Sequence, residues 1–216
     1  MTQIAFLLYP QMTALDFVGP YEVLSRLPGA QTRFVTAHPG AIHTDMGLVV
    51  HAPDGYDDVP RPDIVVVPGG PGTFPLLDDE RTLDWLRRAH ATTRWTTSVC
   101  TGSLLLGAAG ILTGKRATTH WIVQDELNRF DAEPNDDRVV TDGKIITAAG
   151  VSAGIDMALT LAAAEAGETT ARTLQLVIEY DPQPPYDSGS LAHADDQIHR
   201  KAIELMTPGA TLTPTR

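Results

Sequence analysis

Short, continuous apolar runs alternate along the chain with longer segments in which apolar residues recur every three or four positions. Runs of the first kind are typical of strands buried on both faces of a sheet, and segments of the second kind are typical of helices that pack against it. The sequence predicts strands at residues 4–9, 32–37, 63–67, 96–99, 138–140 and 144–147. It predicts helices after the first strand through Leu24 and Leu27, and at residues 81–91, 102–111, 153–166, 168–180 and 195–206.

Turn-forming residues mark the places where these elements end. Asp142-Gly143 lies between the last two strands and predicts a two-residue hairpin turn. Ser152 directly precedes the next helix, so we expect its side chain to cap that helix, and we expect Gly167 to end it. Residues 43–59 follow neither period, and we interpret them as a small hairpin or excursion.

The alternation of strands and helices indicates one doubly wound α/β domain with a mostly parallel sheet. No internal repeat and no linker-like stretch divides it. We expect residues 1–190 to form this domain, and residues 191–216 to add a C-terminal helix and a polar tail that packs on it or extends from it. Prolines within residues 182–189 cannot support helical hydrogen bonds, so this segment is expected to be extended.

Composition and charge narrow the range of partners. Of the 216 residues 43% are hydrophobic, and 27 acidic against 16 basic residues give a formal net charge of −11. Because no basic run could neutralise phosphates, we expect no binding to nucleic acid or to an anionic membrane. The longest weakly polar stretch, residues 148–164, contains Ser152 and Asp156 and is too short to span a bilayer. No basic segment precedes the first apolar run, so we expect a cytoplasmic location.

Cys100 is the single cysteine, and it follows a predicted strand at the point where small residues open a helix. Ligands bind beyond the carboxyl ends of the strands in sheets of this kind, and the order strand, nucleophile, helix is typical of a nucleophile elbow. Amide groups at a helix N-terminus stabilise a thiolate, so we expect a reactive thiol with a lowered pKa. The alternative is that Cys100 is a small buried hydrophobic residue without chemistry.

Two further features follow apolar strands. The loop at residues 68–73, Pro-Gly-Gly-Pro-Gly-Thr, either lets backbone amides approach a ligand closely or forms a tight turn only. Its spacing matches neither of the two glycine-rich phosphate-binding motifs, which disfavours nucleotide binding. Asp16 lies between Leu15 and Phe17 and is either a helix N-cap or a buried functional acid, with Glu22 as the alternative functional carboxylate.

The spacing of the seven histidines predicts no metal site. His120 is the one histidine with a candidate role, because a cysteine–histidine pair is a usual way to activate a thiol. Against catalysis, a histidine beside Trp121 at a strand end is often packed and hydrogen-bonded for structural reasons. We therefore interpret His120 as structural.

Several of these segments together resemble the ThiJ/PfpI superfamily of class I glutamine amidotransferase-like proteins, over roughly residues 4–187. The downstream histidine–x–glutamate of amidotransferases is absent. The isocyanide-hydrating branch is the most similar, through Asp16 in place of a glutamate, the Cys100-Thr101 pair and segments 149–156 and 183–189. The segments that carry the superfamily resemblance are residues 4–10, Asp16 with residues 19–23, residues 67–70, 98–102 and 118–121.

The resemblance implies a flavodoxin-like sandwich, a homodimer, a small-molecule substrate and no cofactor. It implies that Cys100 is the nucleophile and Asp16 the acid and base in hydration of an isocyanide to an N-formamide through a thioimidate. It also implies that Gly70 and Thr101 supply backbone donors and that the turn of Gly150-Val151 packs beside the thiol. A glyoxalase-like or other carbonyl-directed cysteine enzyme and a non-catalytic thiol sensor of stress or redox state are the open alternatives.

Overall fold

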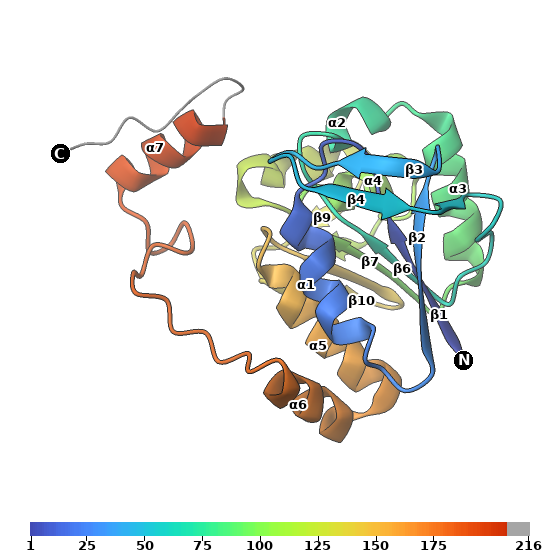
Figure 1. Cartoon of the computed structure of the whole chain (residues 1–216). Coiled ribbons are helices and arrows are strands. Elements are labelled where there is room, and N and C mark those ends of the chain that lie inside the picture. The colour runs from blue at the N-terminus through green and yellow to red at the C-terminus, as the bar shows by residue number, and fades with distance from the viewer. Residues whose placement is uncertain (207–216) are drawn as a thin grey trace. The chain divides into compact units, whose positions relative to one another are not determined.

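The structure is a computed structural model that describes residues 1–206. The chain divides into two units, Met1–Glu179 and a second unit that begins at Tyr180. The first unit holds a sheet covered by helices on both faces (Figure 1). The second unit holds α7, Asp196–Met206, after a stretch without helix or strand. The predicted polar tail beyond residue 206 lies outside the described residues.

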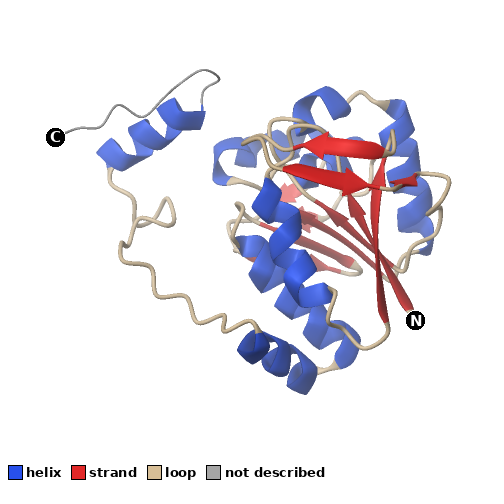
Figure 2. Cartoon of the chain, viewed as in Figure 1, coloured by secondary structure: helices blue, strands red, loops and turns tan. Residues whose placement is uncertain are grey.

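Seven strands form the central sheet of the first unit (Figure 2). They are β1 Thr2–Leu7, β2 Ala30–Thr36, β5 Asp54–Gly55, β6 Ile64–Val67, β7 Trp95–Val99, β10 Val139–Asp142 and β11 Ile145–Ala148. Their order across the sheet is β10-β11-β7-β6-β1-β2-β5. All neighbouring pairs are parallel except β10 and β11. The predicted α/β fold with a mostly parallel, doubly wound sheet is therefore confirmed.

Helices close both faces of the sheet because its central strands are apolar on both sides. Every residue of β6 and of β11 is buried. On one face α1, Ala14–Leu24, packs beside α5, Ala153–Ala166 (Figure 1). On the other face α3, Glu80–Thr92, packs against α4, Gly102–Ala108.

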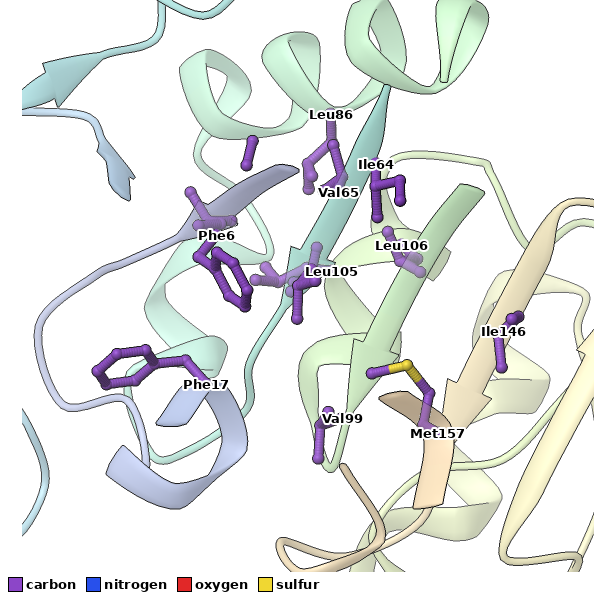
Figure 3. Close-up of a cluster of buried hydrophobic side chains, with 14 of the residues drawn as sticks. Phe6, Phe17, Ile64, Val65, Leu86, Val99, Leu105, Leu106, Ile146 and Met157 are labelled. Carbon is purple, nitrogen blue, oxygen red and sulfur yellow. The ribbon is translucent and has the colours of Figure 1, made fainter. Parts of the chain in front are cut away.

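The hydrophobic core lies between the sheet and these helices. Figure 3 shows Leu86 of α3 and Leu105 of α4 beside Val65 of β6, and Met157 of α5 near Val99 at the end of β7. All five side chains are fully buried. Burial of each such side chain contributes about 1.5–3 kcal/mol. The core thus fixes the strand ends and the helix starts from which the site is built.

The hairpin of β10 and β11 is confirmed, but its turn lies one residue later than predicted. Asp142 is still paired and faces Ile145, so the turn consists of Gly143 and Lys144. Gly143 has a φ of +61°, which suits the tight turns that connect two antiparallel strands.

The ends of α5 agree with the sequence in position, but the predicted capping bond is wrong. Ser152 stands at the N-cap position without a capping hydrogen bond, and its hydroxyl accepts one from the Arg138 guanidinium instead (3.2 Å). Gly167, with a φ of +86°, ends the helix as predicted. The following helix, α6, covers Glu168–Val177 and is shorter than predicted.

The small hairpin predicted within residues 43–59 is present, but it begins three residues earlier, at Gly40, and the short strand β5 follows it. Four short elements were not predicted. No helix within residues 1–206 is long and apolar enough to cross a membrane. The hairpin consists of β3 Gly40–His43 and β4 Val49–Ala52, and the unpredicted elements are α2 Thr73–Leu76, β8 Arg116–Ala117, the 3₁₀ helix η1 Trp121–Phe130 and β9 Glu133–Pro134.

Candidate active site

Cys100 occupies the sharp turn between β7, which ends at Val99, and α4, which begins at Gly102. Its φ is +57°, a left-handed conformation that costs a non-glycine residue on the order of 1–3 kcal/mol. Glycine is required at position 102, because a Cβ there would collide with the carbonyl oxygen of Val67. This strained turn after a buried strand is the geometry of a nucleophile elbow.

Asp16 is a buried acid rather than a helix cap. Thr13 occupies the N-cap position of α1, and Asp16 lies in the first helical turn with no exposed surface. Its Oδ2 accepts a hydrogen bond from the Gly69 amide at 2.8 Å, and its Oδ1 has no partner within residues 1–206. Burial raises the pKa of Asp16 to about 7, although the Gly69 amide and the Cys100 thiol act in the opposite direction.

The backbone amides of Thr101 and Val151 and the Thr101 side chain favour the thiolate of Cys100 and so act to lower its pKa. Burial, followed by the negative charge of Asp16, raises the pKa of Cys100, and the two amides offset only part of this effect. The prediction of a lowered pKa for this thiol is therefore wrong. It considered the helix N-terminus alone, and here desolvation outweighs it.

Cys100 and Asp16 act on each other as one titrating unit. A thiolate and a carboxylate side by side in a buried site are mutually unfavourable, so the pair retains one proton near neutral pH. Because the pKa of Asp16 is about 7, the carboxyl group can both accept and release that proton at physiological pH. A nucleophile and an acid–base group are thus in place together.

The turn of Gly150-Val151 connects β11 to α5 and places the Val151 amide at the thiol of Cys100. Val151 has a φ of +23°, which is rare for a β-branched residue. A Cβ at Gly150 would lie 2.8 Å from Cδ2 of His120, so the turn packs directly on the imidazole ring.

The glycine loop after β6 contacts both Asp16 and Thr101. Gly69 donates its amide to Asp16, and a Cβ on Gly69 would lie 2.5 Å from the nitrogen of Thr101. Gly70 has a φ of +127° and donates its amide to Oγ1 of Thr101 at 2.8 Å. A role of the Gly70 amide toward substrate stays a prediction, since this structure engages that amide with Thr101.

His120 and Glu22 are not joined to the Cys100 thiol by any interaction within residues 1–206. His120 is buried at the start of η1, and its Nδ1 accepts a hydrogen bond from the Ile122 amide at 3.3 Å. Burial lowers the pKa of His120, which keeps the imidazole neutral at pH 7. Glu22 is exposed on α1 and forms an ion pair with Arg26 at 2.7 Å.

Two further buried hydroxyl groups, which the sequence analysis did not single out, are linked to Thr101 by short oxygen–oxygen contacts. The Tyr9 hydroxyl donates to the carbonyl oxygen of Pro68 at 2.6 Å and lies 2.9 Å from Oγ1 of Thr73. Oγ1 of Thr73 lies 2.8 Å from Oγ1 of Thr101. The signal that could have found them is their position, since Tyr9 follows β1 and Thr73 closes the glycine loop.

Within the described residues no group of three or more histidine, cysteine or acidic side chains could hold a metal ion. The chemistry that the arrangement itself supports is nucleophilic attack by sulfur with proton transfer through Asp16.

The fold and the elbow cysteine define a class of protein: an α/β sandwich with a buried cysteine–carboxylate pair at the carboxyl ends of its parallel strands. The chain belongs to the DJ-1/PfpI family, whose model matches residues 2–164.

Three relatives refine this membership. The isonitrile hydratase of Pseudomonas putida is 47% identical over 210 residues, which are 97% of this chain and 92% of that protein. The crystal structure of a ThiJ/PfpI family protein from Pseudomonas syringae superimposes with a TM-score of 0.91 at 39% identity, covering 94% of this chain and 85% of that one. Drosophila melanogaster DJ-1beta shares the fold, with a TM-score of 0.76 at 21% identity over 82% of this chain and 97% of that one.

Proposed function

We propose that the protein hydrates an isocyanide to the corresponding N-formamide. The observation that carries the proposal is the buried pair of Cys100 and Asp16, which combines a nucleophile with a group that exchanges protons near pH 7. The likeness to the isonitrile hydratase of Pseudomonas putida supports the same substrate class. The reaction adds one water to R–N≡C, and both the oxygen and a hydrogen are added to the terminal carbon.

In the first half of the reaction, the sulfur of Cys100 attacks the terminal carbon of the isocyanide. Asp16 takes the thiol proton and delivers it to the same carbon. One C–S bond and one C–H bond form while the carbon–nitrogen bond becomes double, which gives a thioimidate. The pair already holds the proton that this step consumes, so none has to enter from solvent.

In the second half, the ionised Asp16 takes a proton from water, whose oxygen attacks the thioimidate carbon. The substrate nitrogen gains a proton, the C–S bond breaks, and the formamide leaves. The amides of Thr101 and Val151 stabilise sulfur as it regains negative charge, and the remaining proton returns to the pair. The Gly70 amide donates to Oγ1 of Thr101 in this structure, and the proposal keeps it as a third donor toward substrate.

The deciding experiment compares formamide production from aliphatic and aromatic isocyanides with turnover of methylglyoxal. We expect formamide from the isocyanides and no turnover by a folded Cys100→Ala variant. Turnover of methylglyoxal without turnover of isocyanides would replace the proposal with a glyoxalase-like activity. No turnover of either compound by the intact protein would favour a thiol sensor.

The proposal includes a homodimer and no cofactor, both implied by the family resemblance, together with the cytoplasmic location that the sequence analysis expects. It includes no nucleic-acid or membrane partner, which the formal net charge of −11 supports. Light scattering on the purified protein tests the dimer, with a monomer mass as the contradicting result.

A further inference from the structure

The start of helix α1 carries a pattern that is typical of a capping box, yet neither of the two capping bonds forms. Thr13 is the N-cap residue and Asp16 is the third residue of the helix, which is the spacing of that motif. In a capping box the threonine hydroxyl accepts the amide of the third residue, whose carboxylate in turn accepts the threonine amide. Here the Thr13 side chain makes no capping hydrogen bond, and the Asp16 carboxylate accepts the amide of Gly69 instead.

Groups from two other segments replace the capping box. The Gly69 amide donates to Oδ2 of Asp16 at 2.8 Å, and the Gly69 carbonyl oxygen accepts the Thr13 amide at 2.8 Å. The Thr13 hydroxyl donates to Oδ2 of Asp45 at 2.6 Å, a bond between residues that are 32 positions apart. The carboxyl group of Asp16 is therefore not used to cap its own helix and is available to the Cys100 thiol.

Asp45 belongs to the turn of the β3–β4 hairpin, which lies outside the central sheet (Figure 1). Its Oδ1 accepts the Met46 amide at 2.8 Å, and its own amide donates to the Met12 carbonyl oxygen at 3.0 Å. The Gln11 amide donates to the His43 carbonyl oxygen at 2.8 Å. Backbone bonds thus join the hairpin to the loop before α1 and fix the carboxylate that accepts the threonine hydroxyl.

We propose that Asp45 is a positioning residue, whose bond to the Thr13 hydroxyl anchors the first turn of α1 and keeps the carboxyl group of Asp16 at the thiol. Without that bond the Thr13 hydroxyl can cap α1, and the Asp16 carboxylate can turn back toward the Thr13 amide, as in a closed capping box. This inference rests on Asp16 being the acid–base group of the proposed function. It gives the hairpin a role in catalysis.

Four variants separate the hydrogen bond of Asp45 from its charge, which also helps to raise the pKa of Asp16. Asp45→Ala removes both the bond and the charge. Asp45→Asn removes the charge but keeps an oxygen for the Thr13 hydroxyl, and the exposed Met46 amide can bond water instead. Thr13→Val keeps the charge and the side-chain shape but removes the bond, and Thr13→Ser keeps both. The other ionisable groups that interact with Asp16 within residues 1–206, Tyr9 and Cys100, stay unchanged.

Turnover of an isocyanide, measured for each variant at its own pH optimum, should follow the bond and not the charge. Asp45→Ala and Thr13→Val should lower kcat at least about fivefold, since a misplacement of about 1 Å costs up to about 10²-fold. Asp45→Asn and Thr13→Ser should stay within about twofold of wild type, because they keep the geometry. Equal losses in Asp45→Ala and Asp45→Asn, with wild-type turnover in Thr13→Val, would overturn the inference in favour of a charge effect.

The rate of Cys100 alkylation by iodoacetamide tests the same anchor without any isocyanide. The negative charge of Asp16 raises the pKa of the thiol, so a retreating carboxylate makes the thiol more acidic. We expect alkylation of Thr13→Val at pH 8 to be about three- to tenfold faster, because lower nucleophilicity offsets part of the gain in thiolate. In an Asp16→Asn background the same substitution should change the rate by less than about twofold, since no charge is left to move.

Two results of this measurement would contradict the anchor. One is an unchanged or slower alkylation rate in Thr13→Val, and the other is the same acceleration with and without the Asp16 charge, which would indicate wider access to the thiol. Thr13→Val and Asp45→Ala break the same bond from opposite sides, so either variant that urea unfolding shows to be folded is sufficient. Failure of isocyanide turnover by the intact protein would leave the alkylation comparison in place, so the two proposals fail separately.

Discussion

Asp16 is held through only one of its carboxylate oxygen atoms: Oδ2 accepts the Gly69 amide at 2.8 Å, whereas Oδ1 has no partner within residues 1–206. A carboxylate with all its lone pairs satisfied is a weak base, because each donated hydrogen bond favours the charged form. Burial has the opposite effect, outweighs both the Gly69 amide and the Cys100 thiol, and brings the pKa of Asp16 to about 7. The Gly69 amide thus orients the acid without removing its basicity.

Asp16→Asn should lower turnover of an isocyanide by on the order of 10²–10⁴-fold. Asparagine keeps the size of the side chain and can still accept the Gly69 amide, but it performs neither proton transfer. If sulfur attack survives, slow hydrolysis should let a covalent adduct accumulate on Cys100, which intact-protein mass spectrometry detects. Glu22→Gln, on the exposed side of the same helix, is the matched control and should retain full activity. A folded Asp16→Asn protein with wild-type turnover would end the catalytic assignment.

Asp16→Asn should become more stable relative to the wild type as pH rises. The folded-state pKa of Asp16 is about 7, above its ordinary value of 3.8, so the folded protein binds more protons between these values. Stability is therefore lost as pH rises from about 4 through about 7, by up to about 4 kcal/mol. Asp16→Asn lacks this loss. Urea unfolding at pH 4, 6 and 8 should show a free-energy difference between variant and wild type that grows with pH in favour of the variant, and a constant difference would contradict the pKa.

His120→Asn should lower activity by less than about tenfold, well below the effect of Asp16→Asn. The reason is that His120 is neutral and its Nδ1 accepts the Ile122 amide, a bond that asparagine can partly replace. Steady-state kinetics on both variants gives the comparison. Equal inactivity of two folded variants would favour a cysteine–histidine mechanism.

Most of the sheet could be predicted because its strands are uniform in character. β6 and β11 are apolar or β-branched throughout, and their burial on both faces produces that pattern directly. The 3₁₀ helix η1 was not predicted although Val123, Leu127 and Phe130 recur at helical spacing, and a kink at Val123 interrupts it. The turn at Gly143 was placed one residue early because the pairing of Asp142 with Ile145 depends on register, which composition does not encode.

The position of Cys100 could be predicted, but its acidity could not. The strand, the cysteine and the small residues are contiguous in sequence, whereas Asp16 and Val151 reach the thiol from distant segments. Burial and the Asp16 charge dominate the thiol pKa, and both are tertiary effects. Tyr9 and Thr73 were missed for the same reason, because each becomes meaningful only through contacts across the fold.

Arg138 forms hydrogen bonds with residues on both sides of Val151 in the chain. Its carbonyl oxygen accepts the Ala149 amide at 2.9 Å, and its guanidinium donates to Ser152 at 3.2 Å and to Asp156 at 2.6 Å. Val151 lies between these anchors with its unfavourable φ of +23°, so the anchors help to keep its amide at the sulfur.

Arg138→Met should therefore lower kcat by about two- to tenfold, the effect of weakening one hydrogen bond that matters in the transition state. The free energy of unfolding should fall by less than about 1 kcal/mol, because the ion pair with Asp156 is largely solvent-exposed. Arg88→Met is the matched control, since Arg88 is equally exposed and pairs with Asp84 on α3. Chemical denaturation and steady-state kinetics on both variants separate the two effects. We expect kcat to fall in Arg138→Met only, with little change in stability. Equal kcat in the two variants would show that the guanidinium contacts do not affect the sulfur through Val151.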